Sequence, residues 1–272
     1  MRYTNPVTRS LHWQKAWFFL DGDVQHTMIS DLNSTTSAPV YSVLDQRLHT
    51  GSVIVDGVET NSTVNAPMHT LWHGNVGYLF PNSKLGASPI NITVSVGKKN
   101  GSWSAIGTSS QPSTTVDLFT ARIEHDNSTF TPVEYTTFPG TSNETFSTKS
   151  SGLNIQSIRI NQSISAVYDG GNNIIMVVFW DMGGGSMAFA PSSADAPITI
   201  TADGNTALLY RLETGEVTVS DPSQTLTKVQ VTISLGKGAT PPHWGAAGLI
   251  ETLDFKYPSG AAAGSSVSQT IS

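Results

Sequence analysis

Two short stretches decide how this chain folds: Lys15-Ala-Trp-Phe-Phe-Leu-Asp-Gly-Asp23 and Trp72-His-Gly-Asn-Val-Gly-Tyr-Leu-Phe-Pro81. Each stretch packs aromatic residues beside Asp, Asn, His or Gly, in a chain with almost no helical pattern elsewhere. Such a mixture is typical of a β-sandwich core with a polar rim. It also suits sugar binding, because the C–H faces of a sugar stack on aromatic rings while its hydroxyls need donors and acceptors. Both interpretations stay open from these residues alone.

The composition indicates a β-protein with few charges. The chain has 272 residues, enough for one large all-β domain or two smaller ones with a full core. Only 12% of the residues are charged, whereas about 25% is usual in soluble domains, and serine and threonine supply the missing polarity. The net charge of −6 argues against a nucleic-acid partner, which would need a basic surface patch.

Several features bear on the compartment. The chain has no cysteine, which excludes disulfides and thiolate metal sites, although a domain of this size needs no disulfide in any compartment. Seven Asn-x-Ser/Thr sequons favour an extracellular, secreted glycoprotein, and they lie at Asn33, Asn61, Asn91, Asn100, Asn127, Asn143 and Asn161. No apolar run reaches membrane-spanning length, and no signal peptide is visible after Met1. A secreted protein is therefore expected to begin upstream, with this chain as a fragment of it.

Period-two alternation recurs along the chain, broken by turn residues about every 8–12 positions, which predicts short antiparallel strands. Strands are expected at Ala16–Leu20, Val24–Ile29, Val40–Leu48, Ile92–Val96, Val116–Ile123, Ser163–Tyr168, Ile174–Trp180, Ala207–Leu212 and Leu226–Leu235. Glycine tolerates the positive φ of tight turns, so hairpin or loop turns are expected at Asp56-Gly57, Asn100-Gly101, Asp169-Gly170-Gly171 and Asp203-Gly204. This pattern favours an all-β fold of stacked antiparallel sheets over a βαβ fold.

A polar segment at Pro139–Gly152 predicts a domain boundary. We expect a first domain over residues 1–142 and a smaller β-sandwich domain over residues 153–240. The end of the chain, residues 259–272, is rich in Gly, Ala and Ser and is expected to be a disordered tail.

Two groups of residues are candidate metal ligands. Asp21 and Asp23 are separated by one glycine, and two carboxylates at a turn can contribute to a structural calcium site; an ordinary Asp-Gly turn is the alternative. His69 and His73 lie four residues apart, a spacing that binds zinc on a helix. The surrounding proline and glycines disfavour a helix, so packing or sugar contact is the better interpretation of these histidines.

Arg47 follows Asp45 at the end of a strand-like run. Its planar guanidinium suits a carboxylate ligand, and an intramolecular pair with Asp45 explains it equally well. No order of Ser, His and Asp predicts a catalytic triad, and no two carboxylates stand out as an acid–base couple. The residues alone do not define an active site.

Taken together, five segments resemble polysaccharide lyase family 8, the hyaluronate, chondroitin and xanthan lyases. Lys15–Asp23 resembles the family's segment of aromatic residues followed by acids, and Val43–Arg47 is similar to a strand end that carries an arginine. Trp72–Pro81 resembles the segment Trp-x-His-x-Asn-x-Gly-Tyr of the family. Pro132–Gly140 and Val217–Gln224 are similar to runs in the central and C-terminal domains. The matches follow the family's order along the chain.

The resemblance implies a central antiparallel β-supersandwich, similar to galactose mutarotase, followed by a small C-terminal β-sandwich. It implies an enzyme that cleaves an acidic polysaccharide, such as hyaluronan, chondroitin or a xanthan-like polymer, by β-elimination without a required cofactor. In the family, the catalytic residues lie on an N-terminal α/α toroid, so none is carried over to this chain. The chain alone is expected to be inactive, because elimination needs a positioned base and a group that stabilises the developing charge.

The resemblance also assigns roles to the candidate residues. Arg47, Trp72, His73 and Asn75 are expected to bind substrate by lining one wall of the cleft, while the sandwiches brace the toroid. Some relatives hold calcium near the acidic segment, where this chain has Gly22 between its two acids. Two other hypotheses stay open. The chain is a non-catalytic carbohydrate-binding or structural β-sandwich, or it is a glycosidase with two carboxylates converging on one cleft.

Overall fold

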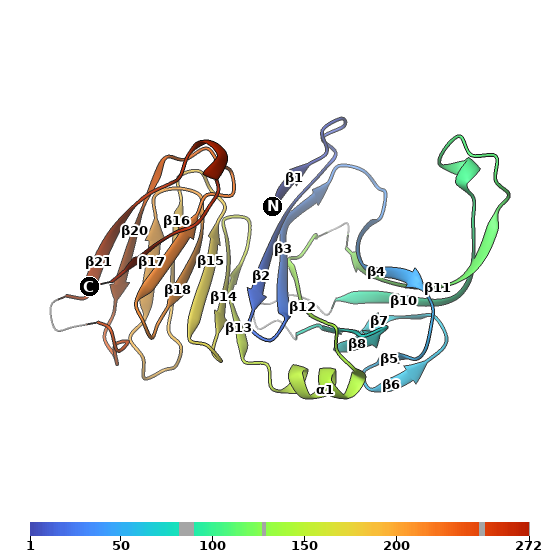
Figure 1. Ribbon diagram of the computed structural model, residues 1–272, viewed down its shortest axis with the longest axis horizontal. Coiled ribbons are helices and arrows are strands. Elements are labelled where there is room, and N and C mark those ends of the chain that lie inside the picture. Colours follow the sequence, from blue (N-terminus) through green and yellow to red (C-terminus); the bar gives the residue numbers. More distant parts are fainter. Residues whose placement is uncertain (82–89, 127–128, 245–247, 272) are drawn as a thin grey trace.

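The computed structural model describes residues 1–81, 90–126, 129–244 and 248–271. Strands form two lobes that lie side by side, and one short helix lies below the first lobe, on the segment that leads to the second (Figure 1). The strand pairs are antiparallel throughout the named elements. The prediction of an all-β supersandwich followed by a smaller β-sandwich is confirmed.

The first lobe contains two facing sheets. An eight-stranded sheet has the order β1-β2-β3-β12-β9-β8-β5-β6, and a four-stranded sheet has the order β4-β11-β10-β7. The bounds are β1 (Arg2–Thr4), β2 (Leu11–Leu20), β3 (Val24–Ser34), β4 (Val40–Leu48), β5 (Val53–Val55), β6 (Val58–Thr60), β7 (Val64–Pro67), β8 (Thr70–His73), β9 (Val76–Leu79), β10 (Asn91–Gly101), β11 (Thr114–His125) and β12 (Val133–Pro139). A 3-10 turn, η1 (Trp103–Ala105), lies between β10 and β11.

Alternating side chains fill the space between these two sheets. Ile92 and Val94 of β10 and Phe119 of the neighbouring β11 lie in one cluster with Leu71 of β8 in the larger sheet, and all four side chains are fully buried. Successive residues of a strand point to opposite faces, so each strand of the smaller sheet puts one apolar row inside and a polar row outside. This alternation is the signal from which the strands were predicted.

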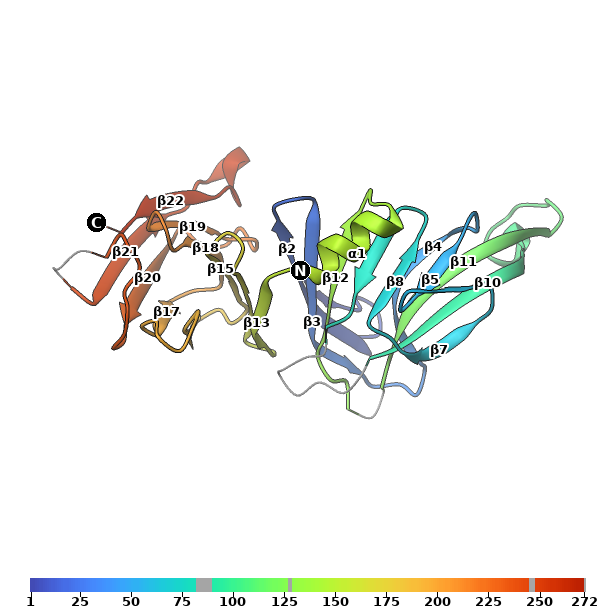
Figure 2. The same cartoon turned by 90° about the horizontal axis from the view of Figure 1, so that it is seen from below.

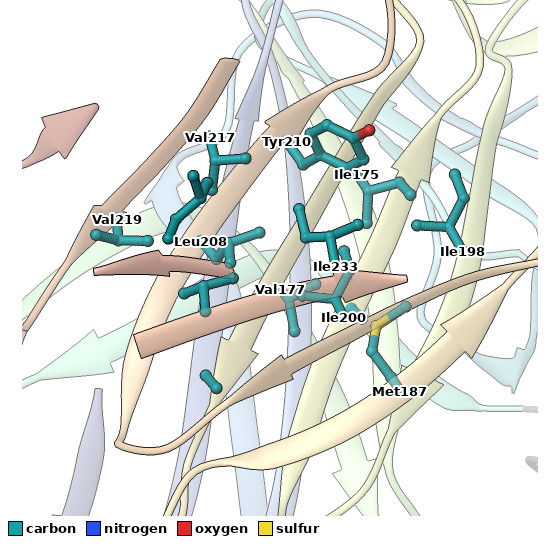
Figure 3. Packing of buried hydrophobic residues seen from close by; sticks show 14 of the residues in the cluster. Ile175, Val177, Met187, Ile198, Ile200, Leu208, Tyr210, Val217, Val219 and Ile233 are labelled. Atoms are coloured by element: carbon teal, nitrogen blue, oxygen red, sulfur yellow. The ribbon is translucent and has the colours of Figure 1, made fainter. Parts of the chain in front are cut away.

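The second lobe repeats the two-sheet plan on a smaller scale. A six-stranded sheet, β13-β14-β15-β18-β19-β22, faces a four-stranded sheet, β16-β17-β20-β21. The bounds are β13 (Ile155–Ile160), β14 (Ile164–Asp169), β15 (Ile174–Phe179), β16 (Gly185–Phe189), β17 (Ile198–Ala202), β18 (Thr206–Arg211), β19 (Glu216–Ser220), β20 (Lys228–Leu235), β21 (Ile250–Lys256) and β22 (Val267–Thr270), with a 3-10 turn η2 (Gly260–Ala262). Its core is dominated by branched aliphatic side chains, with Tyr210 at one end of the cluster (Figure 3).

The lobes are joined by a third apolar cluster. Phe18 of β2 and Met28 of β3 pack against Val167, Met176 and Trp180 of the second lobe. The pairs β13–β3 and β14–β2 lie next to each other across the junction (Figure 1). The aromatic stretch that begins at Lys15 therefore supplies part of the interface between the domains.

Polar contacts reinforce this junction. Arg2 donates through Nη2 to the carbonyl of Trp180 over 2.9 Å, and Ser157 of β13 donates its hydroxyl to the carboxylate of Glu134 on β12. His26 lies beside that carboxylate, and its Nδ1 forms a 2.9 Å hydrogen bond with the hydroxyl of Thr136. Both side chains of the His26–Glu134 pair are almost fully buried, so the polar groups of the junction depend on one another for hydrogen bonds.

The predicted boundary segment contains a helix, α1 (Asn143–Ser151), which lies beside β12 and β8 (Figure 2). Ser142 caps it by accepting a hydrogen bond from the Thr145 amide over 3.2 Å. Phe146 is the buried residue of the helix and meets Phe138 edge-on at 5.3 Å. A Cβ on Gly77 would lie 2.2 Å from the Phe146 ring, so the glycine of the β8–β9 segment is what allows the helix to approach.

Three sequence-based predictions are wrong. The second domain does not end at residue 240, because β21 pairs with β20 and β22 pairs with β19. Residues 259–272 are not a disordered tail in their described part: β22 is an edge strand and Ile271 is 4% exposed in the core. Asn100-Gly101 ends β10 in register with β11 and does not form the hairpin turn. Composition suggested a disordered tail, but Val267 and Ile271 pack against the core and β22 pairs with β19.

None of the helices in the described part of the chain has both the length and the apolar character needed to cross a membrane.

The ordered end of the chain makes a testable prediction. Ile271→Ala is expected to lower the free energy of unfolding by about 2–5 kcal/mol, because it removes buried methylene groups and leaves a cavity. Thr270→Ala, at the exposed last residue of β22 next to Ile271, is the control and is expected to stay within about 0.5 kcal/mol. Denaturant unfolding of the three proteins measures this, and equal stabilities would show that the end of the chain does not pack.

Candidate substrate-binding site

Arg47 joins the two sheets of the first lobe at one end of the sandwich. It lies on β4 of the smaller sheet and donates through Nη1 to the carbonyl of Gly74, in the turn between β8 and β9 of the larger sheet, over 3.0 Å. Gly74 has a φ of +55°, and a Cβ there would lie 2.8 Å from Nη1. The turn therefore accepts the guanidinium because this position has no side chain.

A β-bulge determines which way Arg47 points. The register between β4 and β11 shifts between Ala121 and Arg122, so Val43 pairs with Arg122 while Asp45 pairs with Ala121. Val43 is exposed on the outer face, and without the shift Arg47, four residues later, would lie on that face too. The bulge instead turns Asp45 and Arg47 toward the end of the sandwich interior.

The predicted intramolecular pair is present. Arg47 Nη2 lies 2.5 Å from Asp45 Oδ2, and the Asp45 side chain is 10% exposed whereas that of Arg47 is 37% exposed. A guanidinium carries five N–H donors, and the hydrogen bond to Gly74 uses one of them while Asp45 lies close as the counter-charge. The remaining donors, on a partly exposed group with a fixed position, suit an oxygen-rich anionic ligand.

His73 is a core residue behind Arg47. It is 1% exposed, its ring lies 4.1 Å from the Phe119 ring, and its Nδ1 lies 3.1 Å from the carbonyl of Ser52, which it meets as an N–H donor. Burial lowers the pKa of His73 below its usual value, and the positive charges of His49 and Arg47 act in the same direction. The neutral ring therefore packs under the site, and a ligand at this surface would meet Arg47 and His49 first.

Trp72 and Asn75 have different surroundings. Trp72 points to the face of β8 opposite His73, where its Nε1 donates to the carbonyl of Thr141 over 2.8 Å and its ring joins the cluster around Phe146. Asn75 is exposed at the tip of the β8–β9 turn with a φ of +64°, and its carbonyl accepts from the Thr141 amide over 2.9 Å. The structure thus brings Arg47 and His73 together, while Trp72 connects the strand to α1.

The sequence analysis missed two further residues that lie at this candidate site, His49 and Tyr78. His49 continues the face of Asp45 and Arg47 on a period of two, and its Nδ1 lies 3.2 Å from Asp117 Oδ2. Tyr78 donates its hydroxyl to the carbonyl of Leu44 over 3.1 Å, and burial, with the Asp45 charge adding to it, raises its pKa well above the usual value. The i, i+2, i+4 spacing of Asp45, Arg47 and His49 was the signal available in the sequence.

Asp21 and Asp23 flank Gly22 in the β2–β3 turn, and both are exposed. The carbonyl of Gly22 accepts a hydrogen bond from the ammonium group of Lys149 over 2.9 Å, so a cation already occupies this turn. The described residues contain no group of three or more His, Cys, Asp or Glu side chains placed to hold a metal. Calcium takes six to eight oxygens, and the two carboxylates here do not fit that requirement on their own.

Solved structures with the same fold include polysaccharide lyases. A chondroitinase AC lyase superposes with a TM-score of 0.79 at 22% identity, covering 98% of this chain and 37% of that chain. A Paenibacillus xanthan lyase superposes with a TM-score of 0.68 at 19% identity, covering 86% of this chain and 23% of that chain. The Streptomyces coelicolor A3 chondroitin AC lyase, solved in complex with chondroitin sulphate, superposes with a TM-score of 0.64 at 21% identity, covering 96% of this chain and 33% of that chain. At these identities the likeness concerns the fold. A comparison with curated proteins gives no match.

Two protein-family models match the sequence and identify the family as well as the fold. The model of the super-sandwich domain of polysaccharide lyase family 8 matches residues 1–150, and the model of the C-terminal β-sandwich domain of that family matches residues 158–230. The chain therefore belongs to polysaccharide lyase family 8, as its aromatic segments predicted. It spans about a third of the length of the chondroitin lyases whose structures it matches.

The lowered pKa of His73 predicts a pH dependence of stability. About one pH unit above the usual histidine pKa of about 6.5, the ring is neutral in both states. As the pH falls, the unfolded chain takes up the proton first and the native state loses stability, because burial lowers the pKa of His73 in the folded chain. His73→Gln keeps an N–H donor but does not titrate. The variant is expected to lose less stability than the parent chain between about pH 7.5 and pH 5.

Denaturant unfolding at several pH values measures this difference. His69→Gln, which replaces an exposed histidine of the preceding turn, is the matched control for the exchange of His by Gln. Parallel pH curves for the parent and His73→Gln would contradict the prediction.

Because Asp21 and Asp23 offer too few oxygen ligands for calcium, we predict that calcium does not change the thermal stability of the chain. Adding calcium on the order of 1 mM should move the midpoint of thermal unfolding by less than about 1 °C, since a ligand stabilises only the state that it binds. Calorimetry with chelator and with calcium tests this. A rise of several degrees that Asp21→Asn abolishes, and that Asp181→Asn leaves intact, would show a calcium site.

Proposed function

We propose that this chain is the β-sandwich part of a polysaccharide lyase that cleaves an acidic polysaccharide by β-elimination. The observation that carries the proposal is the match of both family domains, in order, along the chain. The chondroitin and xanthan lyases with the same fold support hyaluronan, chondroitin or a xanthan-like polymer as the substrate class. Because the chain spans about a third of those enzymes, the catalytic groups are assigned to a helical domain of the whole protein.

Within such an enzyme, the sandwiches would brace the helical domain and line the cleft. The substrate of such an enzyme carries uronate carboxylates, and a guanidinium held in a fixed position binds a carboxylate through its planar fork of donors. Arg47 fits this role because Gly74 and Asp45 hold it in place while part of the group stays exposed. His73 and Tyr78 support it from behind as buried neutral groups, and the elimination needs no cofactor in this scheme.

The proposal includes secretion as a glycoprotein. Among the sequons in the described residues, the asparagine side chains that are exposed to solvent are those of Asn33, Asn61, Asn91, Asn100 and Asn143. An exposed asparagine is accessible to glycosylation in the secretory pathway. Asn127 lies outside the described residues, and Asn161 is partly buried.

Activity of the whole protein, with its helical domain, tests the role of Arg47. Arg47→Ala is expected to lower kcat/KM for an acidic polysaccharide about tenfold or more, with the ultraviolet absorbance of the unsaturated uronate product as the readout. Arg47→Lys keeps the charge but loses the planar fork, so it should recover only part of the activity. Arg159→Ala removes an exposed arginine of the second domain and is the control.

The chain alone should release no unsaturated product, because the proposal places the catalytic base elsewhere. Cleavage by the isolated chain would refute this division of roles. An unchanged kcat/KM in Arg47→Ala would refute the assignment of Arg47 to the cleft but would leave the family assignment intact.

A further inference from the structure

One end of the second sandwich contains a cavity of about 270 Å³. Four connections surround it: the β14–β15 turn, the β16–β17 loop, the β18–β19 turn and the start of the β20–β21 loop. None of the residues already assigned to the substrate site takes part in it. The two lobes therefore each present a candidate site, built from different elements.

The loops that form the cavity are held together by backbone contacts. Asp195 and Ala239 form a parallel bridge, in which the Ala196 amide donates to the Ala239 carbonyl over 2.9 Å and the Ala239 amide donates to the Ala194 carbonyl over 3.1 Å. Gly238 has a φ of +149°, and a Cβ there would lie 2.5 Å from the Ala196 nitrogen. The wall is thus a defined structure that a ligand would not have to organise.

The floor and sides of the cavity are largely apolar. Ile198 and Leu212 close the bottom from the core, and Tyr168 is buried beside them with its ring 5.1 Å from that of Phe189. Prolines contribute three further surfaces, at Pro191, Pro241 and Pro242. Rigid C–H surfaces of this kind accept the apolar face of a ring without losing conformational entropy.

The polar groups at the cavity are mostly acceptors. The Tyr168 hydroxyl donates to Asn173 Oδ1 over 2.7 Å, and Asn173 Nδ2 donates to Glu213 Oε1 over 3.1 Å, so the asparagine is held from both sides. The Asp195 carboxylate accepts no hydrogen bond from the residues that the structure describes, and its negative charge adds to burial in raising the pKa of Tyr168. An ionised carboxylate has about four acceptor positions, so Asp195 and Glu213 can together accept several hydrogen bonds from a ligand besides the one that Glu213 accepts from Asn173.

Charge narrows the class of ligand. No Lys, Arg or His is among the described residues that line the cavity, while two carboxylates are. A uronate or sulfated sugar would place its negative charge beside these carboxylates without a counter-charge, which is unfavourable at short distance. The lining therefore disfavours an anionic ligand and suits one that supplies hydroxyl donors and an apolar face.

We propose that this cavity binds a single uncharged sugar ring, whose hydroxyls donate to Asp195 and Glu213 while its C–H face rests on the proline-lined wall. The volume is slightly below the range of about 300–1,000 Å³ that is usual for small-molecule sites, which suits one ring and not a chain. The proposal does not depend on lyase activity, because it rests on the second lobe alone.

Binding to the intact chain tests the proposal. With methyl β-D-glucopyranoside and methyl β-D-galactopyranoside as neutral probes, we expect saturable millimolar binding of at least one, by calorimetry or ligand-observed NMR. Glucuronate should bind at least tenfold more weakly than that probe, and ethanolamine should not compete with it. Asp195→Ala should weaken binding tenfold or more, whereas Asp181→Ala, which removes an exposed carboxylate outside the cavity, should not.

Thermal unfolding of each variant shows that it is folded. Asp195→Asn keeps one acceptor oxygen and is expected to bind between the parent and Asp195→Ala. The proposal is overturned if neither glucoside nor galactoside binds, if glucuronate binds as tightly, if ethanolamine displaces the sugar, or if Asp195→Ala binds like the parent. Loss of lyase activity in the whole protein would leave this result unaffected.

Discussion

Burial of β3 on both faces is the constraint on which the rest of this molecule depends. Met28 faces the second lobe, and its neighbour Ile29 faces the core between the two sheets of the first lobe. A strand buried on both sides reads as a nearly continuous apolar run, as Val24–Leu32 does in part. Its polar residues, such as His26, are tolerated because partners on β12 meet them inside the junction. The four sheets consequently stack as successive layers, with β2 and β3 in the layer that touches both neighbours.

The candidate substrate site follows from that layering. Sheets that face each other expose their strand ends at the rim, and there β4 and the β8–β9 turn approach closely enough for one arginine to join them. The strand that follows this turn, β9, carries Gly77, which makes room for Phe146 of α1 on the other face. One short hairpin therefore holds Arg47 in position on one side and anchors the linker between the domains on the other. A substitution in this hairpin would therefore affect both the position of Arg47 and the packing of α1.

The two candidate sites have opposite electrostatic character. Arg47 offers N–H donors at the rim of the first lobe, which suits an acidic polymer. The cavity of the second lobe is lined by Asp195 and Glu213, which suits a neutral ring that brings its own donors. Net charge alone, at −6, predicts neither site, since it averages over both. Local charge, set by which side chains the sheets bring together, decides what each surface can bind.

By itself, the sequence determined the fold class, the central part of nearly every long strand and the family, because alternation and turn glycines are local signals and the aromatic segments are distinctive. It also predicted that Arg47 and His73 belong to one candidate site, although their proximity depends on two different sheets. The tertiary structure decided the bulge that turns Arg47 inward, the burial of His73, the separation of Trp72 from them and the packing of Ile271 at the end of the chain. Each of these depends on pairing between strands far apart in the sequence, and a period-two pattern contains no information on register, on bulges or on which strand a short apolar segment will join.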